Sequence, residues 1–207
     1  MTEVNYALIL IASFIAVASP GPATLAIAGT SMAQGRLKGS VLATGITTGS
    51  LIWSCSAALG FSAIMYTNLW LFELMRYLGA SYLLFMAYKS ARAAFSQSPL
   101  LIKNAKEKSL AATYYRGVAI HLTNPKAIFF FAALYAVAFP VDTQLIEILT
   151  VNGLIVLQGF IVFQTYAFLF SVPKVREFYL QMKRWFEAFF AMAFGFAGFK
   201  IFTLDID

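Results

Sequence analysis

The chain has 207 residues, of which 60% are hydrophobic and only 12% are charged, and its mean hydropathy is +0.76. A soluble domain of this length does not bury so much apolar surface, so we expect an all-α integral membrane protein with lipid as its solvent. The formal net charge of +6 does not indicate nucleic acid, because the basic residues cluster between apolar stretches, as they do beside membrane spans.

Six apolar stretches are long enough to cross a bilayer, and we take the whole chain, 1–207, as one membrane domain. The N-terminus lacks the basic start of a secretory signal, so we expect the first stretch to be retained. The predicted spans are Val4–Met32, Gly39–Tyr66, Leu69–Tyr88, Tyr115–Phe139, Leu145–Val172 and Trp185–Leu204.

The basic residues predict how these spans are oriented, because cytoplasmic connections carry an excess of Lys and Arg. The side of the membrane that holds the second and fourth connections and the two termini carries few basic residues, namely Arg76 and Lys200. We therefore expect the first, third and fifth connections in the cytoplasm and both termini outside it. The basic residues on the cytoplasmic side are Arg36, Lys38, Lys89, Arg92, Lys103, Lys106, Lys108, Arg116, Lys174, Arg176, Lys183 and Arg184.

Three spans in each half give the halves opposite orientations, which predicts two inverted three-helix repeats. The first repeat covers about 1–94, a basic cytoplasmic connection covers about 95–113, and the second repeat covers about 114–207. Between Lys174 and Phe189, apolar residues recur at helical spacing among charges, which predicts a short amphipathic helix on the cytoplasmic leaflet that turns into the last span.

The first predicted span is interrupted by Pro20, Gly21 and Pro22. A proline removes the hydrogen bond to the carbonyl four residues earlier, so Pro20 frees the carbonyl of Ala16 and Pro22 that of Ala18. The helix that restarts after Pro22 presents free N–H groups and the positive end of its dipole, which suit a carboxylate. The alternative is a kink that serves packing.

The fourth predicted span is interrupted by Asn124 and Pro125, and Lys126 follows. Pro125 frees the carbonyl of His121, and Asn124 can cap the next helix. Lys126 lies roughly 15 Å along the helix from Arg116, a depth at which an unpaired lysine is costly. We expect it to face a polar cavity and to hold a substrate carboxylate or exchange a proton; the alternative is a purely structural bond to freed carbonyls.

Further polar residues are candidates for the cavity or for proton transfer. His121 is the single histidine and its side chain titrates near neutral pH, although a hydrogen-bonded core role is the commoner one. Thr48 and Ser50 lie in the second span and Gln158 in the fifth. Gly45 and Gly49 form a GxxxG pair, which permits close helix contact and a homodimer.

The sequence contains no catalytic or metal-binding constellation, so we expect no enzyme, no cofactor and no metal site. A single histidine and a single cysteine, Cys55, do not make a soft-metal site. The acidic residues fall near predicted membrane edges or in connections, so we also expect no buried carboxylate.

These motifs together resemble the LysE/RhtB family of amino-acid exporters. The matching stretches occur in the family's order and cover residues 1–140, while the last two spans match in hydropathy and length. One departure is Ser50, where many relatives carry an acidic residue after the second-span glycines. The matching stretches are Ser19–Pro22, Gln34–Arg36 with Gly39, Gly45–Gly49, Leu78–Leu83, and Gly117 with Leu122–Ala127.

The resemblance implies a multi-pass transporter of a bacterial inner membrane that exports amino acids or close derivatives, driven by the proton gradient. The two proline motifs would form its central site, with the substrate carboxylate at Lys126 and the substrate ammonium at the freed carbonyls. The expected absence of a buried acid favours small neutral amino acids. The alternatives are metal or small-ion efflux, a membrane enzyme or redox carrier, and a structural subunit; the expected partners are membrane lipid and the substrate.

Overall fold

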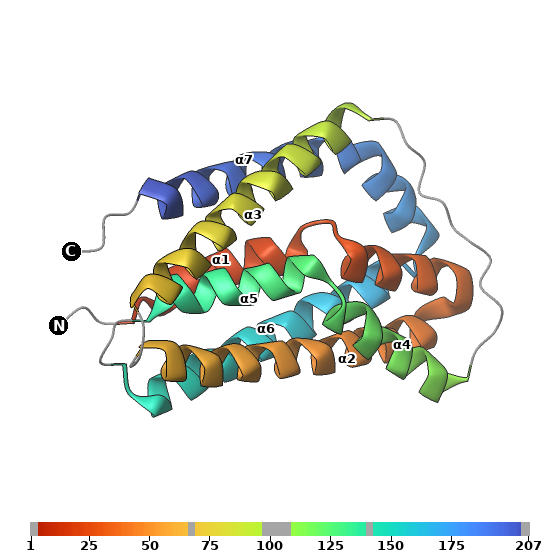
Figure 1. Cartoon of the computed structure of the whole chain (residues 1–207). Helices are drawn as coiled ribbons and strands as arrows, with labels where there is room; N and C mark the ends of the chain where they lie inside the picture. The colour runs from red at the N-terminus through yellow and green to blue at the C-terminus, as the bar shows by residue number, and fades with distance from the viewer. Residues whose placement is uncertain (1–3, 66–68, 97–108, 140–142, 204–207) are drawn as a thin grey trace.

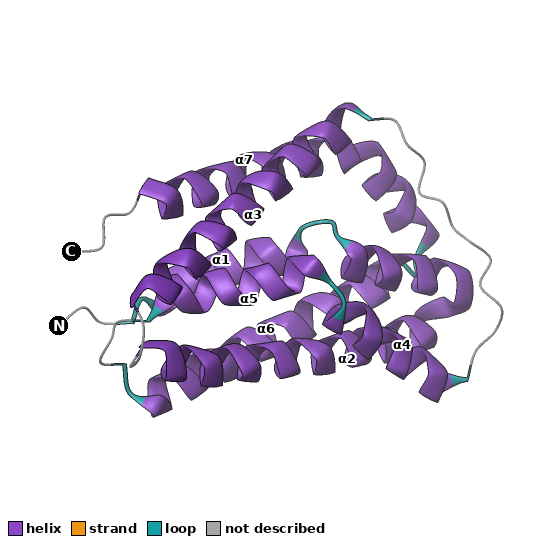
Figure 2. Ribbon diagram, viewed as in Figure 1, coloured by secondary structure: helices purple, strands orange, loops and turns teal. Residues whose placement is uncertain are grey.

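A computed structural model gives the fold and describes residues 4–65, 69–96, 109–139 and 143–203. In this part of the chain every regular element is a helix, as predicted for an all-α membrane protein (Figures 1 and 2). The helices are α1 (Tyr6–Ala18), α2 (Pro22–Met65), α3 (Leu69–Phe95), α4 (Leu110–Leu122), α5 (Pro125–Ala138), α6 (Leu145–Leu169) and α7 (Pro173–Thr203).

Both proline motifs interrupt helical structure. Residues 19–21 separate α1 from α2, and residues 123–124 separate α4 from α5, which meet at an angle of 55°. Pro22 and Pro125 are the first residues of the helices that follow. A proline is well suited to this position, because the N–H group that it lacks would have no partner inside the helix.

The predicted connection between the first two spans, residues 33–38, is replaced in the structure by a sharp turn at a single residue of α2, Gly35. α2 is helical on both sides of Gly35, whose φ of 83° and ψ of 172° turn the chain. A positive φ of this size favours glycine, because a Cβ atom would be strained there. The first two predicted spans therefore meet at Gly35 with no loop between them.

Other boundaries differ from the prediction. α3 continues past Tyr88 to Phe95, and α4 begins at Leu110, before the predicted start at Tyr115. The amphipathic segment and the last span form one helix, α7. Most of the predicted connection 95–113 lies outside the described residues, as do the two chain ends.

The helices pack in two groups that α5 joins. α2 packs along α4 and α6, α3 packs along α7, and α5 contacts both α2 and α3 (Figure 1). Glycines bring α2 and α4 together: a Cβ at Gly45 would overlap the carbonyl of Tyr114, and one at Gly117 the carbonyl of Leu42. The GxxxG pair therefore serves contact within the chain and gives a homodimer no support.

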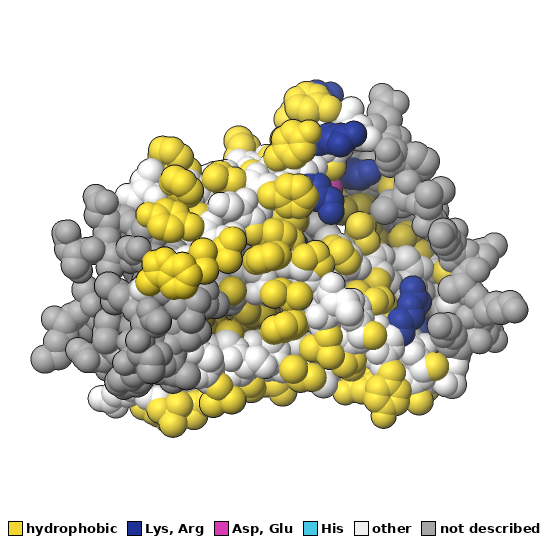
Figure 3. Space-filling model, in the orientation of Figure 1, with side chains coloured by type: hydrophobic (Ala, Val, Ile, Leu, Met, Phe, Trp, Pro, Cys, Tyr) yellow, Lys and Arg dark blue, Asp and Glu magenta, His cyan; other side chains and the backbone are white. Residues whose placement is uncertain are grey.

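The described helix ends lie at two opposite ends of the molecule. The corner in α2, the end of α3 and the starts of α4 and α7 lie at one end; the start of α1 and the end of α7 lie at the other (Figure 1). Lys and Arg side chains gather toward the first end, and apolar side chains are spread over much of the described surface in this view (Figure 3). Leu59, Phe95 and Phe196, for example, are more than two thirds exposed, as residues facing lipid would be.

Three described helices are long and apolar enough to cross a membrane: Pro22–Gly60, Leu145–Leu169 and Pro173–Thr203. The bent pair α4 and α5 passes the same test when taken as one broken span, and α1 is a shorter apolar helix. Six spans in two inverted repeats remain a prediction.

Candidate functional site

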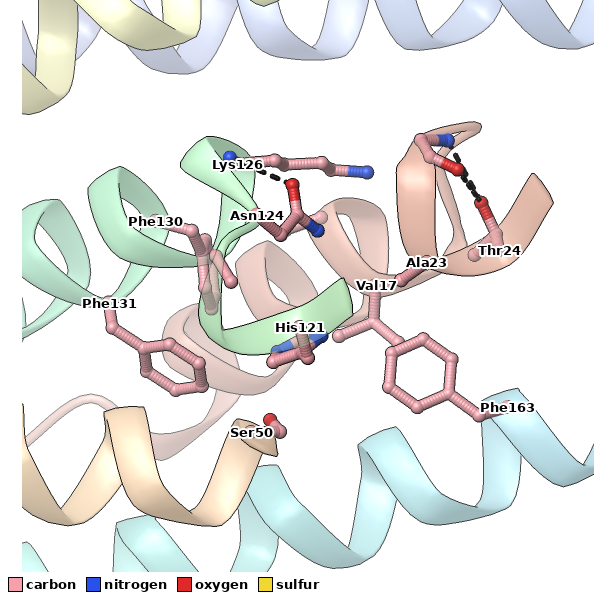
Figure 4. Close-up of a pocket in the computed structure, with 13 residues that line it drawn as sticks. Val17, Ala23, Thr24, Ser50, His121, Asn124, Lys126, Phe130, Phe131 and Phe163 are labelled. Carbon is pink, nitrogen blue, oxygen red and sulfur yellow. Dashed lines mark hydrogen bonds between the residues drawn. The ribbon is translucent and has the colours of Figure 1, made fainter. Parts of the chain in front are cut away.

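The two helix breaks lie next to each other, and Lys126 joins them. This residue is the second in α5, is 9% exposed, and extends toward the first break (Figure 4). Its ammonium donates hydrogen bonds to the carbonyl of Ser19, at 2.9 Å, and to the Ser19 hydroxyl. The structure thus brings together residues 107 positions apart in the chain.

Hydrogen bonds from nearby side chains satisfy the first break. The Ser19 hydroxyl donates to the Ala16 carbonyl at 2.8 Å, and the Tyr166 hydroxyl of α6 donates to the Ala18 carbonyl at 2.5 Å. The Thr24 hydroxyl accepts the N–H of Gly21 at 2.9 Å (Figure 4). The carbonyls that Pro20 and Pro22 free therefore already have partners, which lowers the cost of broken backbone in lipid.

Asn124 organises the second break. Its side-chain oxygen accepts the N–H of Lys126 at 3.1 Å and caps α5, as predicted. Its own N–H donates to the carbonyl of His121 at 3.1 Å. The third freed carbonyl therefore also has a protein donor.

A small cavity of about 40 Å³ lies between the breaks. Gly21, Ser50, His121, Asn124 and Lys126 line it together with apolar side chains (Figure 4). Such a volume holds on the order of two or three water molecules, which is less than an amino acid needs. In this conformation the cavity, which is mostly apolar with a few polar groups, must enlarge before it can hold a substrate.

His121 is a polar group of this cavity that has no hydrogen-bond partner among the described residues. It is 5% exposed, and neither ring nitrogen has a hydrogen-bond partner among the described residues. Its ring meets that of Phe163 edge to face, with the ring centroids 6.1 Å apart. A buried imidazole with two unpaired nitrogens can bind water, a substrate group or a proton.

The remaining predicted residues lie around this centre. Pro20 lines a neighbouring groove, while Pro22 and Pro125 are exposed at the starts of their helices. Thr48 accepts the Tyr114 hydroxyl at 2.9 Å, and Gln158 donates to the carbonyl of Leu10 at 3.0 Å. Neither Thr48 nor Gln158 lines the cavity, so both connect helices here.

The neighbouring groove has a volume of about 790 Å³ and lies between α1, α6 and α7. Its lining is almost entirely apolar and includes Ala18 and Pro20 of the first break. Tyr166, whose hydroxyl holds the Ala18 carbonyl, also lines it. The groove therefore adjoins the break whose Ser19 holds Lys126.

The expectation of no buried carboxylate is wrong. Glu187 of α7 is 6% exposed, although Lys183 and Arg184 just before it are typical of a membrane edge. The prediction failed because the charges of Lys183 and Arg184 led us to place the whole helical turn, including Glu187, at the membrane interface. The spacing of Glu187, Phe190 and Phe194 on one helical face was a signal that could have identified it.

Sequence reasoning also missed three side chains of the first break. Ser19 is the partner of Lys126, Thr24 closes the turn, and Tyr166 arrives from α6. Ser19 and Thr24 stand beside the proline motif, where capping hydroxyls are common. For Tyr166 the sequence offers no local signal, because its contact depends on how α6 packs.

Comparison with known proteins identifies related sequences. The sequence profile of the family described as "LysE type translocator" matches residues 14–204. The chain is 28% identical over 190 residues to the threonine efflux protein of Escherichia coli K12, covering 90% of this chain and 91% of that protein. It is 31% identical over 140 residues to the leucine efflux protein of Klebsiella pneumoniae, covering 68% and 66%. No solved structure matches the chain significantly.

Proposed function

Since the chain belongs to the LysE type translocator family, we propose that it exports amino acids across the bacterial inner membrane. The family members are transporters, and relatives over most of its length are named for efflux of threonine and leucine. The observation that carries the proposal is the meeting of two broken helices at Lys126. Broken helices at a membrane centre are typical of the substrate sites of secondary transporters.

The proposed substrates are small neutral amino acids or close derivatives. The Lys126 ammonium uses two of its three N–H donors on Ser19, which leaves one for a substrate carboxylate. The relatives' named substrates are both neutral. We propose that export is driven by the proton gradient, with His121 as the proton carrier.

The proposed mechanism is alternating access around this centre. The chain would cross the membrane six times as two inverted repeats, with both termini outside the cytoplasm, and the repeats would rock about the breaks. The described Lys and Arg side chains gather toward one end of the molecule (Figure 3), which supports this orientation. The groove beside Pro20 is the route by which we expect the cavity to enlarge.

Amino-acid export from bacterial cells fed with dipeptides tests the proposal. Cells that express the wild type, Lys126→Ala or Lys174→Ala are compared with cells that carry an empty vector; Lys174 is an exposed lysine at the start of α7 and serves as the matched control. We expect faster export of a neutral amino acid with the wild type and Lys174→Ala, and export near the vector level with Lys126→Ala.

Two results would contradict the proposal in different ways. Unchanged export by Lys126→Ala would remove the carboxylate role from this residue. Wild-type export at the vector level across a broad dipeptide panel, with the protein present in the membrane, would contradict amino-acid export itself. Metal sensitivity of the same cells would then test the ion-efflux alternative.

A further inference from the structure

Glu187 is a buried carboxylate in α7, one of the helices long and apolar enough to cross the membrane. An acidic residue inside a membrane protein is costly, and such residues usually mark a substrate or ion pathway. The proposed carboxylate site and proton carrier make no use of it. Its surroundings therefore indicate what it does.

Glu187 faces α3. Its carboxylate accepts a hydrogen bond from the side chain of Ser90, which is also buried. Three lysines are close enough for their charges to act on it: Lys89, Lys183 and Lys126. Lys89 is exposed and Lys183 is partly exposed, so water weakens their effect, whereas Lys126 is buried.

One face of α7 connects Glu187 to Lys126. Phe190 and Phe194 follow Glu187 at helical spacing, so the three side chains lie on the same side of the helix. The ring centroid of Phe194 lies 5.8 Å from the Lys126 ammonium, and Phe190 lines the groove. By helical rise, Glu187 and Phe194 are roughly 10 Å apart along the axis. Opposite charges thus stand at the two ends of a short aromatic strip.

The groups first expected to bind the substrate ammonium are already engaged. The carbonyls of Ala16, Ala18 and His121 each accept a hydrogen bond from the protein. A carboxylate is also a stronger acceptor for an ammonium than a carbonyl is. Glu187 is therefore the better acceptor for a positively charged substrate group.

We infer that Glu187 binds the ammonium group of the exported amino acid while Lys126 binds its carboxylate. The substrate class is then the zwitterionic α-amino acid, recognised through both its ammonium and its carboxylate, with its apolar part against Phe190 and Phe194. This inference rests on the proposed export function.

Transport in proteoliposomes tests it, with leucine as substrate and its 2-hydroxy-acid analogue, which lacks the ammonium, as competitor. Glu187→Gln removes the charge and keeps an oxygen for Ser90. Glu177→Gln, at an exposed acid of the same helix, is the control. We expect Glu187→Gln to weaken apparent leucine binding by about 10- to 100-fold, the worth of a hydrogen bond to a charged group, and to leave inhibition by the hydroxy acid unchanged.

The outcomes separate this inference from the proposed function. If Glu187 only stabilises the α3–α7 contact, Glu187→Gln weakens the binding of leucine and of the hydroxy acid in parallel and lowers the unfolding midpoint. That result, or an unchanged ratio of leucine affinity to hydroxy-acid affinity, overturns the inference and leaves the proposed function intact. A wild type that transports neither leucine nor threonine overturns both the inference and the proposed function.

Discussion

Gly21 offers a direct test of the Lys126 arrangement. A Cβ placed on Gly21 would lie 3.1 Å from Cδ and 3.3 Å from Nζ of Lys126. Both contacts are a few tenths of an ångström too close. The backbone itself tolerates alanine, because among the described residues Gly35 is the glycine with positive φ. The substitution Gly21→Ala should therefore act by displacing the lysine side chain.

The size of the effect follows from the bonds that Lys126 makes. Displacement weakens its hydrogen bonds to Ser19, and a hydrogen bond to a charged group is worth about 1.5–3 kcal/mol. We expect Gly21→Ala to raise the half-saturating substrate concentration for export by about tenfold or more. The control is Gly29→Ala in α2, the helix that begins directly after Gly21, because a Cβ there would have no atom within 4 Å.

A double-mutant cycle with Lys126→Ala, measured by unfolding in detergent micelles, isolates this mechanism. If Gly21→Ala acts through the lysine, its destabilisation of about 1 kcal/mol should largely disappear once the lysine side chain is gone. Equal destabilisation in both backgrounds, or export by Gly21→Ala that matches Gly29→Ala, would refute the reasoning.

Three further predictions concern the surroundings of the site. Gly45→Ala should destabilise the protein by about 1–3 kcal/mol, because the new Cβ meets the backbone of α4. Gly153→Ala is the control, because its Cβ enters open space and should leave the stability equal or slightly higher. The unfolding midpoint of each variant checks this. Tyr166→Phe removes the donor to the Ala18 carbonyl and should lower the free energy of unfolding by about 1–3 kcal/mol. The control in the same assay is Phe168→Leu at an exposed site of α6. Equal unfolding midpoints for the two variants would contradict this prediction. His121→Phe should leave the fold intact, because neither ring nitrogen has a described partner, and should remove the response of export to an imposed pH gradient; a retained response would exclude His121 as the proton carrier.

Those parts of the fold that depend on local chemistry could be predicted from the sequence. The proline motifs located both helix breaks, because the loss of a backbone donor acts wherever the residue stands. Asn124 was identified as a cap for the same local reason. The corner at Gly35 was predicted as a connection over residues 33–38, since a gap between two apolar stretches does not show how few residues the turn needs.

Those parts of the site that depend on how helices pack could not be predicted in this way. Tyr166 reaches Ala18 across 148 positions, and no property of either residue alone indicates that contact. The GxxxG pair was correctly expected to bring helices close, but the sequence does not say whether the partner is α4 or a second copy. Glu187 was misassigned for the related reason that burial depends on the neighbouring helix, here α3.

Counting hydrogen-bond groups shows where a substrate can bind. Each carbonyl freed by a proline has a donor within the chain, so the breaks themselves offer little spare capacity. The groups at the cavity between the breaks that remain available to a ligand include one N–H of Lys126 and the two ring nitrogens of His121, which have no partner among the described residues. A buried polar group without a partner costs about 1–3 kcal/mol, so a ligand that supplies one recovers that free energy. The two breaks thus bring the unpaired groups to the cavity between them, and these groups favour the binding of a polar substrate in the cavity.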